Sequence, residues 1–212
     1  MTGVQTCALP ILNILPKPIA DRLQDGQNII ADSFSDVSVL FADLVGFTNF
    51  ASDKTATETV KVLNQIFSRF DQLSLQHGLE KIKTIGDAYM VVGGLPEPQE
   101  NHAEAIAQMA LDMQAAVASF NAKNNHSFSL RIGINSGGVV AGVIGLTKFS
   151  YDLWGDTVNV AHRMESNGIP GEIQVTAAVY ERLKDKFSFK VRGAIEIKGK
   201  GEMIVYLLLG RN

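Results

Sequence analysis

Two long amphipathic segments of this chain lie on either side of a pair of short apolar runs, and that order leaves few folds open. Residues 57–76 and 101–121 carry apolar side chains every three or four positions, which is the spacing of one helix face. Between them, residues 79–85 and 89–93 are close enough in sequence to form a hairpin. Further strand-sized apolar runs precede and follow this group, at 37–42 and 128–134. The order strand, helix, strand, strand, helix, strand predicts an α+β fold with a ferredoxin-like βαββαβ core.

The remainder of the chain adds elements to this core. We expect a strand at 139–144, helices at 157–167 and 177–184, and terminal strands. The chain has 212 residues, of which 46% are hydrophobic, so it can bury a full core in one domain of ordinary size.

The N-terminal part differs in pattern from the rest. Residues 1–11 share no pattern with the remainder of the chain, and we interpret them as a leader that is not native to the protein. Residues 12–34 place Pro16 and Pro18 ahead of a helical turn or two, which predicts a connector that couples the domain to an upstream segment. An ordered extension that packs on the core is the alternative. Residues 35–212 form the main domain.

Charge and cysteine content exclude several classes of protein. The net charge is −3 and the lysines and arginines are scattered, which argues against a nucleic acid or an anionic membrane as the partner. Cys7 is the one cysteine, so the chain has no internal disulfide and no multi-cysteine metal site. No apolar run approaches the roughly 20 residues of a membrane-spanning helix. These features predict a cytoplasmic domain, and any membrane attachment would lie outside this chain.

Two aspartates stand at the ends of strand-sized apolar runs. Asp43 follows the run at 37–42, and Asp87 lies in the short gap of the predicted hairpin. Mg²⁺ and Mn²⁺ prefer such hard oxygen ligands, and Mg²⁺ usually takes one or two protein carboxylates and completes its shell with water and phosphate oxygens. Two converging aspartates therefore indicate nucleotide chemistry. The alternative for either residue alone is a turn or cap position.

Four sequence blocks identify a resemblance to a known family. The segments FADLVGFT, KIKTIGDAYMVVGGLP, LRIGINSGGVVAGVIG and YDLWGDTVNVAHRMES occur in this order, and together they resemble the signature blocks of class III nucleotidyl cyclases over residues 35–209. The resemblance implies the class III nucleotidyl cyclase fold. It also implies two Mg²⁺ or Mn²⁺ ions per active site, held by Asp43 and Asp87, with the Leu44 carbonyl as a further metal ligand.

The same resemblance assigns residues to the substrate. The backbone beside Asp43 would complete a phosphate cradle, with Gly46, Phe47 and Thr48 as its members. Asn159 would orient the ribose and Arg163 would stabilise charge on the α-phosphate.

Four residues apart, Asn159 and Arg163 lie on one helix face, so they can reach one substrate together. A solvent-exposed pair is the alternative reading of that spacing. Arg131 and Lys198 would bind the triphosphate, although Lys200 could take the place of Lys198.

Two further positions concern the purine. In the family, lysine before TIGD and aspartate after the tyrosine of the last block accompany ATP, and here these residues are Lys83 and Asp152. The adenine 6-amino group donates to an acceptor such as the Asp152 carboxylate, and Lys83 can donate to ring N1 or pair with Asp152. Guanine would present O6 to that carboxylate and N1–H to the lysine, which is unfavourable. A Lys–Asp pair with a purely structural role is the alternative.

The resemblance implies an adenylate cyclase that converts ATP to 3′,5′-cyclic AMP and pyrophosphate at the interface of a homodimer. The chain carries both sets of site residues, so a symmetric dimer would have two complete shared sites. An upstream sensor or regulatory domain is expected outside this chain. The alternatives are a guanylate cyclase, a nucleotide-binding regulatory module without turnover, and a polymerase or diguanylate-type enzyme with a related core.

Overall fold

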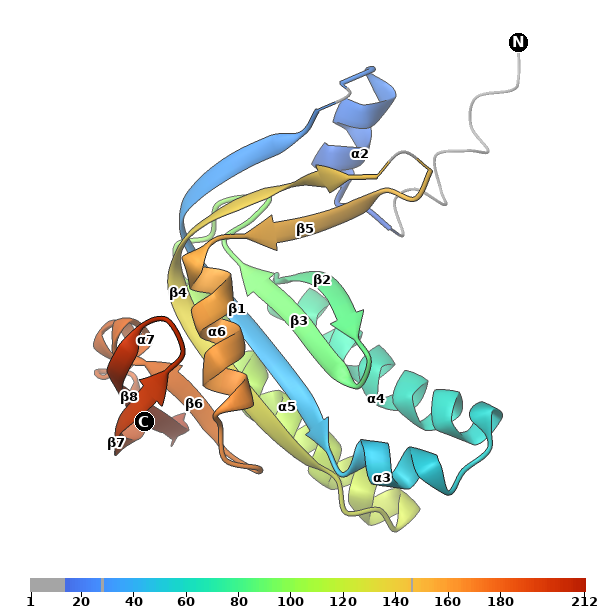
Figure 1. Cartoon of the computed structure of the whole chain (residues 1–212), viewed down its shortest axis with the longest axis vertical. Helices are drawn as coiled ribbons and strands as arrows, with labels where there is room; N and C mark the ends of the chain where they lie inside the picture. The colour runs from blue at the N-terminus through green and yellow to red at the C-terminus, as the bar shows by residue number, and fades with distance from the viewer. Residues whose placement is uncertain (1–13, 28, 146) are drawn as a thin grey trace.

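The computed structural model describes residues 14–27, 29–145 and 147–212. From the N-terminus its elements are α2 (Lys17–Gln24), β1 (Ala31–Val45), α3 (Phe47–Ser52), α4 (Ala56–Gln76), β2 (Glu80–Ile85), β3 (Ala88–Gly93), α5 (His102–Asn124), β4 (Ser129–Ile144), β5 (Ser150–Trp154), α6 (Asp156–Ser166), β6 (Ile173–Thr176), α7 (Ala177–Leu183), β7 (Phe187–Ile197) and β8 (Gly201–Arg211). Figure 1 shows their arrangement around one strongly curved sheet.

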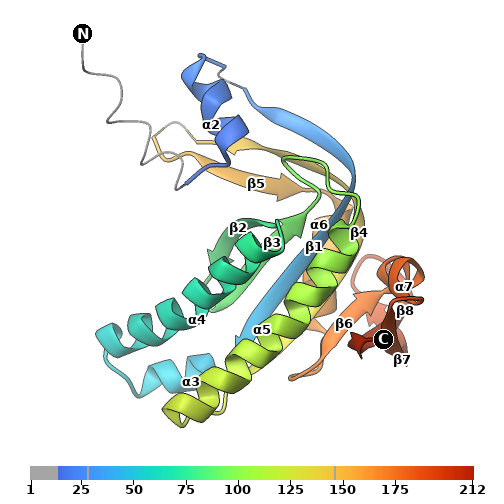
Figure 2. The same cartoon turned by 180° about the vertical axis from the view of Figure 1, so that it is seen from behind.

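The predicted ferredoxin-like core is confirmed. The sheet has the strand order β2-β3-β1-β4-β6-β8-β7, with β5 paired to β4 beside this path. The first four strands in this order pair with one another in antiparallel fashion and are connected through α4, the β2–β3 hairpin and α5, whereas β4 and β6 are parallel. The long helices α4 and α5 cover one face of the sheet (Figure 2), and α6 lies on the other face (Figure 1).

Alternation along β1 explains why helices cover both faces. Leu40 and Leu44 belong to the core cluster that includes Phe70 of α4 and Met109 of α5. Phe41, between them, belongs to the opposite cluster. Because successive strand residues point to opposite faces, an almost continuous apolar run in β1 is buried on both sides. Helix α4 begins with a capping box, in which the Thr55 side chain accepts from the Glu58 amide and the Glu58 carboxylate accepts from the Thr55 amide.

The helix α6 packs unusually closely against β4. A Cβ atom at Gly133 of β4 would lie 1.9 Å from the amide nitrogen of Glu165 in α6, so no other residue fits there without displacing the helix. At the start of α6, the Thr157 hydroxyl donates to the Gly138 carbonyl at 2.7 Å and the Asn135 side chain donates to the Thr157 carbonyl at 3.1 Å. These contacts fix the helix against the strand.

Two local predictions were wrong. The segments 128–134 and 139–144 were expected as separate strands, but β4 is one strand that includes the intervening Asn-Ser-Gly-Gly. Gly137 pairs with Val37 of the neighbouring strand β1, and the Asn135 side chain accepts a hydrogen bond from Thr176 at 2.8 Å. Contacts with neighbouring segments thus hold these residues, which often form turns, in an extended strand. The short strand β5 was not predicted, and it carries Asp152.

The N-terminal boundary also differs from the prediction. β1 begins at Ala31, inside the segment expected as a connector, while α2 packs on the domain through Ile19 and Ala20. The segment 1–11 lies outside the described residues. In the part of the chain that the structure describes, no helix is long and apolar enough to cross a membrane.

Candidate active site

Asp43 and Asp87 lie side by side at one end of the sheet. Asp43 is near the end of β1 and pairs in register with Ala88 of β3, the residue after Asp87. Asp87 occupies the tight β2–β3 turn, where its carbonyl accepts a hydrogen bond from the Leu44 amide at 3.2 Å. Burial and the nearby charge of Asp87 raise the pKa of Asp43, and Arg131 opposes that rise. The two predicted metal ligands therefore converge, as the sequence suggested.

This pair fits a divalent ion that shares its coordination shell with substrate and water. Among residues 14–27, 29–145 and 147–212, the structure contains no group of three or more His, Cys, Asp or Glu side chains arranged to hold a metal. Two carboxylates are nevertheless what Mg²⁺ commonly takes from a protein. The donors are hard oxygens, and Asp87 is kept in place by the Thr48 hydroxyl, which donates to its carboxylate at 3.2 Å.

The segment after Asp43 turns sharply into α3. Gly46 stands at the N-cap with φ = 90°, a left-handed conformation that glycine adopts without strain. Phe47 is buried, and its ring packs against Phe50 and Phe128. This packing fixes the backbone from Leu44 to Thr48 beside the two carboxylates.

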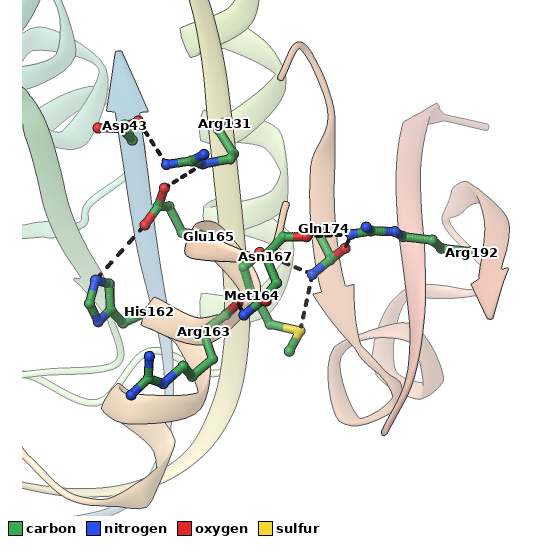
Figure 3. A network of polar contacts seen from close by, with 9 residues as sticks. All are labelled: Asp43, Arg131, His162, Arg163, Met164, Glu165, Asn167, Gln174 and Arg192. Atoms are coloured by element: carbon green, nitrogen blue, oxygen red, sulfur yellow. Dashed lines mark hydrogen bonds and ion pairs between the residues drawn. The ribbon is translucent and has the colours of Figure 1, made fainter. Parts of the chain in front are cut away.

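Arg131 faces Asp43 directly across the β1–β4 pair and contacts two carboxylates. Its Nη2 donates to Asp43 Oδ2 at 3.0 Å, and its Nε donates to Glu165 Oε1 at 2.7 Å (Figure 3). The Glu165 side chain is only 6% exposed. Burial raises the pKa of Glu165, whereas the bond to Arg131 lowers it. The predicted triphosphate-binding arginine is thus held inside an ion-pair network.

A second group of predicted residues surrounds a cavity of about 360 Å³ between α6 and the β7–β8 turn. Asn159, Arg163 and Lys198 all line it, so residues that lie almost forty positions apart in sequence meet there. Lys200 also lines the cavity, but its ammonium group donates to Asp156 at 2.7 Å. Within the ranges that the structure describes, Lys198 forms no ion pair, which favours Lys198 over Lys200 as the cation available to a ligand.

Lys83 and Asp152 are in direct contact. Lys83 Nζ on β2 donates to Asp152 Oδ2 on β5, and the other carboxylate oxygen accepts from the Leu153 amide at 2.9 Å. The Asp152 side chain is 16% exposed and that of Lys83 is 37% exposed. Asp152 lies on β5, which runs directly into the helix that carries Asn159 and Arg163, whereas Lys83 lies on β2, four residues before Asp87.

The structure does not bring the two groups together within one chain. In Figure 3 the Arg163 side chain points away from the contact between Asp43, Arg131 and Glu165, although α6 carries both Arg163 and Glu165. We call the end of the sheet with Asp43, Asp87 and Arg131 the metal end, because the two aspartates are candidate metal ligands. None of these three residues lines the α6 cavity, which contains Arg163 and Lys198.

Sequence reasoning missed two residues near the site. Glu165 is the second-to-last residue of the block YDLWGDTVNVAHRMES, and no local pattern distinguishes it from an exposed helix residue, since its partner Arg131 is 34 positions away. His162 lines the α6 cavity, contacts the Phe41 ring in a tilted arrangement with the ring centroids 5.2 Å apart, and lies 4.0 Å from the Glu165 carboxylate. A histidine one position before Arg163 on the same helix was the available signal for this neighbour.

Comparisons with known proteins agree with this geometry. The family model described as adenylate and guanylate cyclase catalytic domain matches residues 29–210. An adenylate cyclase of Mycobacterium tuberculosis is 50% identical over 202 residues, which cover 95% of this chain and 46% of that protein. The human guanylate cyclase soluble subunit beta-2 is 43% identical over 199 residues, covering 92% of this chain and 32% of that protein. The chain thus spans less than half the length of these relatives.

A solved structure shows the same architecture. The guanylate cyclase domain of RhGC from Catenaria anguillulae, solved in complex with GTP, superposes with a TM-score of 0.82 at 36% identity. The match covers 85% of this chain and 100% of that one. The chain therefore belongs to the adenylate and guanylate cyclase catalytic domain family, and its fold is the class III nucleotidyl cyclase fold that the four sequence blocks implied.

Proposed function

We propose that the protein is an adenylate cyclase, which converts ATP to 3′,5′-cyclic AMP and pyrophosphate. The observation that carries this proposal is the contact between Lys83 and Asp152. The carboxylate can accept a hydrogen bond from the adenine 6-amino group, and the lysine can donate to ring N1. Guanine would meet the same two groups with O6 and N1–H, and both contacts would be unfavourable.

Asp43, Asp87 and the Leu44 carbonyl would hold two Mg²⁺ or Mn²⁺ ions. Bound there, the ions would supply charge stabilisation at the phosphates and a lowered pKa for the ribose 3′-hydroxyl. The chain's own contribution is to hold the two carboxylates together at the rim of the sheet despite their mutual repulsion. The backbone amides of Gly46 to Thr48 would take phosphate oxygens beside them.

The α6 cavity would bind the rest of the substrate. Asn159 would orient the ribose so that its 3′-oxygen lies in line with the bond to the leaving pyrophosphate. Arg163 would stabilise the negative charge that develops on the α-phosphate, and Lys198 and Arg131 would bind the triphosphate. A fixed planar guanidinium suits a phosphate group because it donates two parallel hydrogen bonds.

A homodimer with two shared sites would complete the machinery. The direction of Arg163, away from Asp43 of its own chain, supports a substrate that is contacted by two subunits. Large apolar side chains on the β4–β5 hairpin are also exposed by 40–54%, as expected for a surface that a second copy covers. The residues concerned are Val140, Ile144, Phe149 and Trp154.

The test is product identification with purified chain, Mn²⁺ or Mg²⁺, and either ATP or GTP. We expect cyclic AMP by mass, with a higher kcat/KM for ATP than for GTP. A guanylate cyclase is the second candidate, favoured by the 43% identity to the human beta-2 subunit. Cyclic GMP as the main product would establish it, and absence of both products at high protein concentration would favour a regulatory module without turnover.

The chain is further proposed to work under the control of another segment. It covers 46% of its mycobacterial relative, which leaves room in a protein of that length for a sensor or regulatory domain. In such a protein the domain described here would be the cytoplasmic catalytic part.

A further inference from the structure

Arg131 is held by two carboxylates that use different nitrogens of its guanidinium. Nη2 contacts Asp43 Oδ2 at 3.0 Å, and Nε contacts Glu165 Oε1 at 2.7 Å. Neither contact uses Nη1. Only Asp43 lies on the metal end of the sheet, whereas Glu165 approaches from α6 behind it (Figure 3).

The backbone of α6 around Glu165 is held in place by side chains from two strands. The Gln174 side chain of β6 donates to the Met164 carbonyl at 3.0 Å, and Arg192 of β7 donates to the Asn167 carbonyl at 2.6 Å. Both bonds satisfy carbonyls in the last turn and at the C-cap of α6. Together with the close approach at Gly133, they leave α6 little freedom to move Glu165 relative to Arg131.

These contacts have different consequences once a metal ion is bound. A divalent ion at Asp43 would compete with Arg131 for the Asp43 carboxylate, since both need its lone pairs. The bond from Nε to Glu165 does not involve Asp43, so it can persist. Arg131 then stays oriented, with its terminal nitrogens directed toward the place where Asp43 and its ligands lie.

We infer that Glu165 is a positioning residue, which anchors Arg131 through Nε so that Asp43 is released to the metal ion and the terminal nitrogens of Arg131 are available to phosphate. This inference rests on the proposed function for the identity of the phosphate-bearing ligand. Without Glu165, Arg131 would have Asp43 as its remaining carboxylate and would compete more strongly with the metal for it. A partly buried charge such as the Arg131 guanidinium, when it loses one of its two partners, depends more strongly on the other.

Mn²⁺ binding measures this competition without turnover. Free Mn²⁺ is followed by electron paramagnetic resonance with nucleotide-free protein, because a nucleoside triphosphate in solution would itself bind Mn²⁺ through its phosphates. In Glu165→Ala we expect the dissociation constant for Mn²⁺ to rise about 10-fold, the scale of one lost charge-assisted hydrogen bond. Glu165→Gln keeps an acceptor oxygen without the charge and should show a smaller rise, of about 3-fold. Because glutamine has nearly the same shape, this variant keeps the test valid if the alanine variant does not fold.

Two controls separate anchoring from general effects. Glu181→Gln breaks the exposed ion pair with Lys184 on α7 and should leave Mn²⁺ binding unchanged. In an Arg131→Met background, Glu165→Gln should produce no further change, since the residue through which it acts is gone.

The inference is overturned if Glu165→Ala or Glu165→Gln binds Mn²⁺ as the wild type does. It is equally overturned if Glu165→Gln weakens binding by the same factor with and without Arg131, because Glu165 would then act by its charge alone. Since no product is formed, a failure of cyclic AMP synthesis would refute the proposed function while leaving this measurement intact.

Discussion

The two ends of the candidate site handle charge in opposite ways. At the metal end, the positive charge of Arg131 offsets part of the negative charge before any ligand arrives, because Arg131 pairs with Asp43 and with Glu165 of α6. In the α6 cavity, Arg163 and Lys198 have no ion pair within the described part of the chain, although Lys200 beside them is paired with Asp156. Among the described residues, the arginine of the metal end is therefore paired with carboxylates, whereas these two cations of the cavity are not.

The largest expected effects come from replacing Asp43 at the metal end or Arg163 in the α6 cavity by alanine. Asp43→Ala should lower kcat at least about 1,000-fold, because it removes a metal ligand and with it several kcal/mol of transition-state stabilisation. Arg163→Ala should lower kcat about 100- to 1,000-fold, the usual cost of one donor to a developing charge. Circular dichroism melts should show folded proteins in both cases. Near-normal turnover in the Asp43 variant at any metal concentration would refute its assignment.

Mixing these two inactive variants tests whether the ends belong to different subunits. In a mixed dimer one site carries both defects and the other is intact, so activity should return to about half per mixed dimer and about a quarter overall for random pairing. Recovery should increase with protein concentration if association is weak. Mixtures that exchange subunits but stay inactive would show that both ends serve one chain.

A smaller effect is expected from the contact between Lys83 of β2 and Asp152 of β5. The double substitution Lys83→Glu and Asp152→Cys should lower the ratio of kcat/KM for ATP to that for GTP by about 10- to 100-fold, because it removes contacts that fit adenine. Steady-state kinetics with both nucleotides gives the ratio. An unchanged ratio would leave the pair with a structural role only.

Lys198 and Lys200 both line the cavity, and they allow an unpaired cation to be compared with a paired one among the described residues. Lys198→Ala should raise KM for ATP about 10-fold, as expected when one charge-assisted contact to a phosphate is lost. Lys200→Ala should change KM less, because Lys200 is already held by Asp156 at 2.7 Å. The reverse order of effects would mean that the β7–β8 turn rearranges when the nucleotide binds.

The smallest effect concerns Glu80, a carboxyl group whose pKa is shifted by burial and not by an arginine partner such as the one that Asp43 and Glu165 share. Burial alone raises the pKa of Glu80, on the same strand as Lys83, from its ordinary 4.5 to about 7. At a pH between 4.5 and about 7, the Glu80 carboxyl is ionised in the unfolded chain and protonated in the folded chain. Unfolding therefore releases a proton, and the free energy of unfolding falls as the pH rises through this range. Glu80→Gln should therefore gain a few degrees in melting temperature over the wild type at pH 8 and nothing at pH 4.

Equal pH profiles for the wild type and Glu80→Gln would show that Glu80 ionises normally in the folded protein. Thermal melts in metal-free buffer at several pH values decide the matter, since no active-site ligand is needed. The matched control is Glu181→Gln, which changes an exposed ion pair on α7.

The sequence predicted those parts of the molecule whose signals are local. The apolar faces of α4 and α5 recur at helical spacing, and the hairpin around Asp87 is short, so each was recognisable from its own residues. β5 was missed because five residues give little pattern and its pairing depends on the continuation of β4. Glu165 was missed for a related reason. Its burial and its ion pair depend on Arg131, which the fold brings next to it from a distant part of the sequence.

The absence of a side chain at Gly133 has a consequence for sequence variation. A single methyl group there would lie 1.9 Å from the Glu165 amide, far inside atomic contact, so any replacement has to push α6 off the sheet. Because that helix carries Asn159 and Arg163 at the cavity and Glu165 beside Arg131, the displacement would alter both the cavity and the contact with Arg131 at once. Position 133 thus tolerates only glycine although it contributes no reactive atom, and a library designed to diversify this domain should leave it fixed.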